Sequence, residues 1–299
     1  MLADRRQVSA LFVHHGPVIL ARDADAAGIS RSVLRRSADR GELTRLGKAA
    51  FVSTGTLEAA SPWEAFRLRS IAFSLSSGPD TFLTGTAAAA VLEIPMVGDP
   101  PDRPTALRPG NAHIGHDRSP YGRVRHGFLP PSHQTRQGRA FTVSPAYCVI
   151  DIARHYGTRD GIVAADRVLA SGLHREVLAN LVGSMERYPG IESARWVVEH
   201  ADSRAESPLE SLGRFAFLSA GLPRAGVECM DPGGWTMVPS RPSDAGTRGD
   251  PGGRWCGEVR QPSRCRDSGP GRQGSGTVAP VTLLRPRSVR MESGGGSAG

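Results

Sequence analysis

The sequence predicts a mixed α/β, mainly helical protein, with an N-terminal winged helix-turn-helix, a mixed α/β middle domain and a disordered C-terminal tail. Residues 1–56 have the pattern of three helices followed by a hairpin. Residues 57–205 alternate helical segments with short strand-like ones. Residues 230–299 contain 15 Gly and eight Pro and lack Ile, Phe, Tyr and Lys. Such a composition cannot bury a core, so we expect this tail to be disordered.

Turn and cap residues divide the N-terminal part into elements. Gly16-Pro17 ends a first helix, and Ser30 is a good N-cap for a third helix that Gly41 ends. Gly47 lies between two alternating segments, as in a hairpin. The expected elements are a helix over 2–14, a short helix over 21–27, a helix over 30–40 and two strands within 43–53.

The middle part mixes helices with short strands. The Pro-, Gly- and His-rich stretch 95–139 predicts short strands and loops, because it cannot form one helix. Ser144 and Pro145 are a typical N-cap and first-turn residue of a helix, and Ser207 with Pro208 open another that Gly221 ends. Further expected elements are helices over 62–73, 84–92, 161–171, 174–186 and 190–202, and a strand over 140–143.

Charge is unevenly distributed along the chain. The net charge is +8, and residues 1–56 carry nine Arg or Lys against five Asp or Glu. Residues 57–229 are balanced, with 18 basic and 18 acidic residues. Basic surfaces attract the phosphates of nucleic acids. The balance therefore favours a nucleic-acid partner for the N-terminal part.

The helix over 30–40 is the candidate DNA-reading element. Val33, Leu34 and Ala38 can face inward. The residues expected to face outward are Arg31, Ser32, Arg35, Arg36 and Arg40. Arginine reads guanine with two hydrogen bonds in the major groove, and cations of the hairpin can contact phosphate or the minor groove. The candidate DNA-binding residues are Ser30, Arg31, Ser32, Arg35, Arg36, Arg40, Arg45 and Lys48. The alternative is a solvated helix that is merely Arg-rich.

Other residue patterns carry no enzymatic or metal chemistry. The Cys residues at 148, 229, 256 and 265 have unrelated spacings, and the His residues at 113, 116, 126 and 133 lie in a Pro- and Gly-rich stretch. Cys148 reads as a core residue, and Asp151 with Arg154 as a pair on a helix surface. The sequence has no run of 18 apolar residues, and its N-terminus is charged, so we expect a cytoplasmic protein without a membrane span. We also expect no catalytic residue, metal or cofactor.

The C-terminal tail reads as a shifted reading frame. The degenerate codons of residues 241–259, read one base forward, permit D-L-R-M-P-E and then E-x-D-G-[VA]-x-[KR]-F. This pattern, after the helix with Ser207, Pro208, Glu210 and Ser211, resembles endonuclease-like domains related to very-short-patch-repair nucleases. Paired carboxylates of that kind hold Mg²⁺ for phosphodiester cleavage, but the chain itself lacks them. A native disordered tail is the alternative.

Three segments resemble a known family. The stretch GISRSVLRRSADRGELTRLGKAAFV within residues 16–53 is similar to the N-terminal winged helix of AbiE-type antitoxins of type IV toxin–antitoxin systems. It departs from the family pattern after Lys48, so that the hairpin glycine is displaced to Gly47. LTGTAAAAVLEIP and VSPAYCVIDIAR resemble two later segments of actinobacterial members, and the resemblance covers about residues 1–225.

The resemblance implies a DNA-binding repressor that controls its own operon and opposes a nucleotidyltransferase-like toxin. Carried over by position, Arg31, Ser32, Arg35 and Arg36 would contact operator duplex DNA. Alternatives are a degenerate endonuclease fusion without its metal-binding carboxylates, and a protein-interaction module. The predicted domains are a DNA-binding unit over 1–56, an antitoxin-like unit over 57–205, a remnant endonuclease helix over 206–227 and the tail over 228–299.

Overall fold

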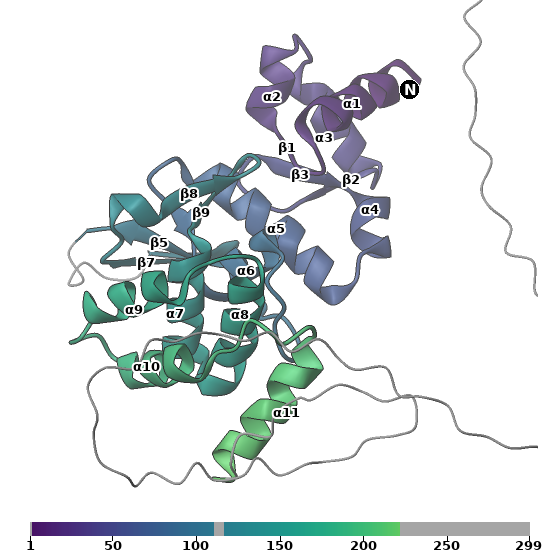
Figure 1. Cartoon of the computed structure of the whole chain (residues 1–299). Coiled ribbons are helices and arrows are strands. Elements are labelled where there is room, and N and C mark those ends of the chain that lie inside the picture. The colour runs from purple at the N-terminus through teal and green to yellow at the C-terminus, as the bar shows by residue number, and fades with distance from the viewer. Residues whose placement is uncertain (1, 111–116, 222–299) are drawn as a thin grey trace, which may run out of the picture. The chain divides into compact units, whose positions relative to one another are not determined.

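A computed structural model describes residues 2–110 and 117–221 of the chain (Figure 1). Residues 2–53 form what we call the N-terminal module, with three helices and a three-stranded antiparallel sheet of order β1-β3-β2. Its elements are α1 (Leu2–His15), β1 (Ile19–Leu20), α2 (Ala21–Ala26), α3 (Arg31–Asp39), β2 (Leu43–Arg45) and β3 (Ala50–Ser53). The predicted helices and hairpin are confirmed, and β1 is an addition that the sequence pattern did not indicate.

Helix α3 is capped at both ends by local hydrogen bonds. The Ser30 hydroxyl accepts from the backbone N–H of Ser32 at the N-terminus. At the C-terminus, Gly41 has a φ of 73° and donates to Ala38, while Glu42 donates to the carbonyl of Ser37. These two bonds form a Schellman motif, which needs a residue that tolerates positive φ. The sequence therefore determines both ends of this helix locally.

The middle part contains a six-stranded mixed sheet of order β6-β7-β5-β4-β9-β8. The pairs β4–β9 and β5–β7 are parallel and the remaining pairs antiparallel. Its strands are β4 (Phe82–Leu83), β5 (Thr105–Pro109), β6 (Asp117–Ser119), β7 (Gly122–Gly127), β8 (Gln134–Gln137) and β9 (Ala140–Val143). Short strands in the Pro- and Gly-rich stretch are thus confirmed.

Helices supply most of the remaining structure, so the mixed and mainly helical class is confirmed. They are α4 (Thr54–Ala59), α5 (Pro62–Ser77), α6 (Gly85–Leu92), η1 (Pro131–His133), α7 (Pro145–Tyr156), α8 (Thr158–Ala170), α9 (Arg175–Gly183), α10 (Ile191–His200) and α11 (Pro208–Ser219). The expected helix over 174–186 ends earlier, at Gly183, and α4 was not expected. None of the helices in the described ranges is long and apolar enough to cross a membrane.

Helix α7 is the centre of the larger core. Ser144 caps it as predicted by accepting from the N–H of Tyr147, and Pro145 occupies its first turn. Helices α6, α8, α9 and α10 all pack against it (Figure 1). Cys148 is fully buried on α7, as expected for a core residue. The tail over 228–299, residues 222–227, the other three cysteines, and His113 and His116 lie outside the described residues.

The interpretation of Asp151 and Arg154 as a surface pair is wrong. Asp151 is 2% exposed, and the Arg154 side chain is 7% exposed. Asp151 accepts hydrogen bonds from the hydroxyl of Thr84 at 2.7 Å and from the guanidinium of Arg125, and lies 3.3 Å from Nε2 of His155. Neighbouring helices cover this part of α7, so Asp151 is enclosed, whereas His155 and Tyr156 at the end of the helix are exposed.

Burial and the partners of Asp151 act on its pKa in opposite directions. Burial favours the neutral carboxyl and raises the pKa, but the Arg125 guanidinium and the hydrogen bonds from His155 and Thr84 outweigh this effect. The pKa of Asp151 is therefore held well below its usual value. A carboxylate with a lowered pKa stabilises the fold above its unfolded-state pKa of about 3.9, and this contribution disappears as the pH falls through the folded-state value.

We predict that Asp151→Asn lowers the free energy of unfolding at pH 7 by about 3 kcal/mol, because Arg125 loses its buried counter-charge. The loss narrows as the pH falls below about 4, because Asp151 then becomes protonated in the unfolded wild type and its contribution to stability decreases. Urea denaturation between pH 3 and 7 measures both effects. Exposed Asp80→Asn is the matched control and leaves stability unchanged. If the loss of unfolding free energy in Asp151→Asn did not depend on pH, the charge of Asp151 would not be its cause.

Candidate nucleic-acid interface

Helix α3 presents one apolar and one polar face. Val33 and Leu34 are buried in a cluster with Val8 and Leu11 of α1. Ser30, Arg31, Ser32, Arg35 and Arg36 are exposed. Because the apolar residues hold one side of the helix against α1, the serine and arginine side chains share the opposite side. This is the arrangement that the sequence predicted for the helix.

Arg31 is paired with a carboxylate of the preceding helix. Its guanidinium donates to both oxygens of Asp25, at distances of 2.6 to 3.0 Å. Hydrogen bonding and charge from Arg31 lower the pKa of Asp25. The two side chains are 71% and 42% exposed, so water screens the pair and Arg31 can exchange this partner for another anion.

Arg36 and Arg40 connect α3 to α1. Arg36 lies 3.2 Å from the carboxylate of Asp4, and Arg40 lies 3.0 Å from Glu42 and donates to the hydroxyl of Ser37. Arg40 was expected to face outward, but its side chain is only 24% exposed. Hydrogen bonds from Arg40 and Arg5 lower the pKa of Glu42 to about 2. Arg40 therefore holds the C-terminal end of α3 in place.

The turn between β2 and β3 is held by Arg45 and Gly47. Nε of Arg45 donates to the carbonyl of Gly47 at 2.9 Å, and its guanidinium also reaches the carbonyl of Lys48. A Cβ on Gly47 would lie 2.7 Å from the hydroxyl of Ser76 on α5, so the turn approaches α5 closely. Arg45 thus braces the turn, and the exposed Lys48 remains at its surface.

Two cations of the candidate interface are not engaged by neighbouring side chains. Within the part of the chain that the structure describes, the side chains of Arg35 and Lys48 make no hydrogen bond or ion pair. Arg35 lies on the exposed side of α3, and Lys48 lies in the turn of the hairpin. Helix α3 also packs against β2, a strand of the same hairpin. The sequence pattern identified both Arg35 and Lys48. It did not identify Asp25 as the partner of Arg31, or Asp4 as the partner of Arg36, because only the packing of α1 and α2 brings these carboxylates close.

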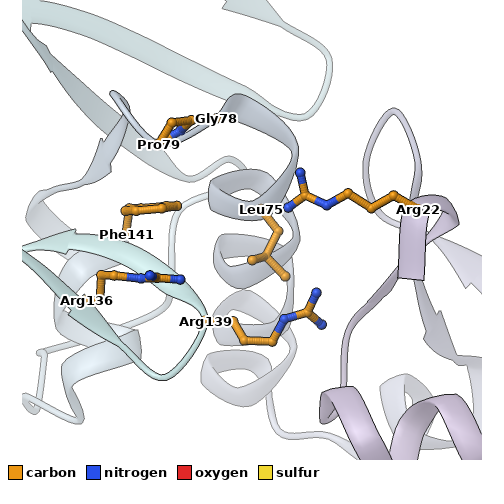
Figure 2. A pocket seen from close by; sticks show the side chains of 7 residues that line it. All are labelled: Arg22, Leu75, Gly78, Pro79, Arg136, Arg139 and Phe141. Carbon is orange, nitrogen blue, oxygen red and sulfur yellow. The ribbon is translucent and has the colours of Figure 1, made fainter. Parts of the chain in front are cut away.

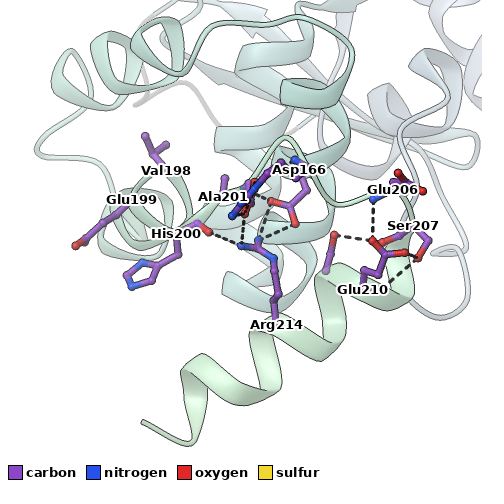
Figure 3. Close-up of polar contacts among 12 residues, drawn as sticks. Asp166, Val198, Glu199, His200, Ala201, Glu206, Ser207, Glu210 and Arg214 are labelled. Atoms are coloured by element: carbon purple, nitrogen blue, oxygen red, sulfur yellow. Dashed lines mark hydrogen bonds and ion pairs between the residues drawn. The ribbon is translucent and has the colours of Figure 1, made fainter. Parts of the chain in front are cut away.

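His133 and Glu210 both form hydrogen bonds at helix N-termini. Nδ1 of His133 lies 2.7 Å from the hydroxyl of Ser144, so it belongs to the cap of α7, and burial lowers its pKa. Glu210 belongs to the N-terminal cap of α11: its N–H donates to the Ser207 hydroxyl, and its carboxylate accepts from the Ser207 hydroxyl and the Glu206 N–H (Figure 3). Across residues 2–110 and 117–221 no group of three His, Cys, Asp or Glu could hold a metal ion.

Helix α11 is anchored through a buried ion pair. Arg214 donates to both carboxylate oxygens of Asp166 on α8 at 2.9 and 3.1 Å, and to the carbonyl of His200 (Figure 3). Burial raises the pKa of Asp166, although Arg214 and the N–H of Asp202 act against this effect. The polar contacts of α11 thus attach it to the middle part of the chain.

No protein-family model and no curated protein matches the chain. Among solved structures, the crystal structure of the RV2827C protein from Mycobacterium tuberculosis is similar, with 14% sequence identity and a TM-score of 0.40. The match covers 71% of this chain and 81% of the other. A likeness of this size carries no argument about fold or function.

Proposed function

We propose that the N-terminal module is a winged helix-turn-helix that binds duplex DNA, with α3 as the recognition helix and the β2–β3 hairpin as the wing. The observation that carries this proposal is the exposed side of α3, where Arg31, Ser32 and Arg35 lie beside one another. The order of three helices followed by a hairpin supports it. Winged helices place such a helix in the major groove and use the hairpin on the adjacent backbone.

The dimensions and chemistry of α3 fit a major groove. An α-helix with its side chains is about 10–12 Å in diameter, and the major groove is about 12 Å wide. Arg35 has no side-chain partner among the described residues, so its donors can bind a guanine edge without breaking another bond. Lys48 lies on the turn of the hairpin and would bind a phosphate.

The acidic residues next to α3 favour discrimination between DNA sequences. Arg31 must leave Asp25, and Arg36 must leave Asp4, before either can bind DNA. Each carboxylate also repels phosphate, which weakens binding to every sequence alike. Contacts to the correct bases then contribute a larger share of the total affinity. A regulator that must find one operator among many competing sites benefits from this balance.

We extend the proposal to a regulator or antitoxin of a type IV toxin–antitoxin system that acts in the cytoplasm. The resemblance of three sequence segments to AbiE-type antitoxins supports this extension. In this proposal, the module binds operator DNA, and the middle domain contacts a nucleotidyltransferase-like toxin. Among the described residues, α11 is what supports the alternative, a degenerate endonuclease fusion. The Glu210 carboxylate of α11 takes part in the helix cap.

The first test compares Arg35→Ala with Lys48→Ala. Duplexes selected from a randomised library, and scrambled versions of them, are titrated with each variant by fluorescence anisotropy. We expect Arg35→Ala to weaken binding to the selected duplex by about 1–3 kcal/mol and to remove the base preference at one position. Lys48→Ala should weaken binding to all duplexes evenly and reduce the salt slope by about one.

Exposed Arg187→Ala, far along the chain on a surface turn, is the matched control and should bind like the wild type. Equal affinity of the wild type, Arg35→Ala and Lys48→Ala for selected and scrambled duplexes would contradict the proposed interface. Circular dichroism spectra of all three variants exclude loss of folding as the cause of any difference.

The second test removes the partner of Arg31. We expect Asp25→Asn to bind duplex DNA more tightly than the wild type, because it frees Arg31 and removes a charge that repels phosphate. The gain should be similar for selected and scrambled duplexes, and the salt slope should steepen by about one. Asp80→Asn, an exposed acid of the middle part, is the control. Unchanged affinity of Asp25→Asn would mean that Arg31 lies outside the interface.

A further inference from the structure

A basic pocket lies where the N-terminal module meets the β8–β9 hairpin (Figure 2). Its volume is about 400 Å³, and three arginines line it: Arg22 of α2, Arg136 of β8, and Arg139 of the turn before β9. Leu75 of α5 and Phe141 of β9 supply apolar walls. None of the lining residues is acidic. The candidate DNA interface uses none of these side chains.

Arg139 is the fixed member of the three. Its guanidinium donates to both carboxylate oxygens of Asp23 at 2.8 Å, and to the carbonyls of His15 and Val18 at 3.2 Å. Asp23 is almost fully buried, so this pair is well shielded from water. Because Asp23 compensates the charge of Arg139, the surplus positive charge of the pocket comes from Arg22 and Arg136.

Arg22 and Arg136 have no carboxylate to balance them. Neither side chain forms a hydrogen bond or ion pair with any residue in the described ranges. The guanidinium of Arg136 lies over the ring of Phe141, 4.6 Å from its centroid, and this contact holds it in one orientation. In Figure 2 the two side chains extend into the pocket from opposite sides. Both guanidinium groups therefore line the same pocket, and neither is paired with a carboxylate.

We propose that this pocket binds a small molecule that carries a phosphate group. Guanidinium donors form a planar fork that matches phosphate oxygens, and two of them together offset the charge of a phosphomonoester. The volume lies at the lower end of the range for small-molecule sites, which fits a ligand no larger than a nucleoside monophosphate. Leu75 and Phe141 would contact the less polar part of such a ligand.

Ligand binding here connects two parts of the fold. A phosphate held by both free arginines would join α2 of the N-terminal module to β8 of the six-stranded sheet, beside the existing contact of Arg139 with Asp23. A ligand that binds the folded state alone raises the melting temperature by mass action. The full chain should therefore become more stable as the pocket fills.

The test measures the melting temperature of the full chain, and the affinity of the full chain for each probe by isothermal titration calorimetry. The probes are inorganic phosphate, pyrophosphate and adenosine 5′-monophosphate, with adenosine and NaCl at matched ionic strength as controls. We expect a saturable rise in melting temperature with the three phosphates and none with adenosine. Arg22→Gln and Arg136→Gln should each weaken binding by about tenfold or more, while Arg187→Gln leaves it unchanged.

Two results would overturn the proposal. One is a response to phosphate that follows ionic strength alone, or that is equal in Arg22→Gln, Arg136→Gln and Arg187→Gln. The other is that none of the three small phosphates binds, while Arg22→Gln and Arg136→Gln weaken binding to duplex DNA. The pocket would then hold a backbone phosphate of DNA and not a small molecule. Both pocket variants remove exposed side chains, and circular dichroism verifies that they fold.

Discussion

The contact of Val33 and Leu34 with α1 determines what α3 can do. These two residues are buried with Val8 and Leu11, and burying each such side chain contributes about 1.5–3 kcal/mol. Because the contact fixes the rotation of α3 about its axis, it also fixes which side chains face solvent. Arg31, Ser32 and Arg35 share a surface only because the opposite side of the helix is held against α1.

Several arginines of the N-terminal module are paired with carboxylates of the same module. Three of its five acidic residues lie next to its arginines: Asp25 beside Arg31, Asp4 beside Arg36, and Glu42 beside Arg40. The pairs differ in exposure, so we expect them to have different roles. The exposed pair of Arg31 can be exchanged for DNA contacts, whereas the less exposed Arg40 stabilises the end of the helix.

Arginines also organise the larger part of the chain, through buried or half-buried carboxylates. Arg125 compensates Asp151 at the centre of α7, Arg214 joins α11 to α8 through Asp166, and Arg139 joins the module to the sheet through Asp23. Each pair connects elements that are distant in the sequence. An enclosed carboxylate with a nearby guanidinium constrains their relative placement, because separating the pair would leave a charge without a partner in a poorly solvated site.

The sequence by itself determined the elements whose causes are local. Ser30, Gly41 and Ser144 define helix ends through bonds within a few residues, so α3 and the start of α7 were predictable, as was the outward side of α3. Only the tertiary structure decided the long-range features. These features are the burial of Asp151, the partners of Arg31 and Arg36, and the pocket that Arg22 and Arg136 line. All of them arise from packing between distant segments, which no local pattern encodes.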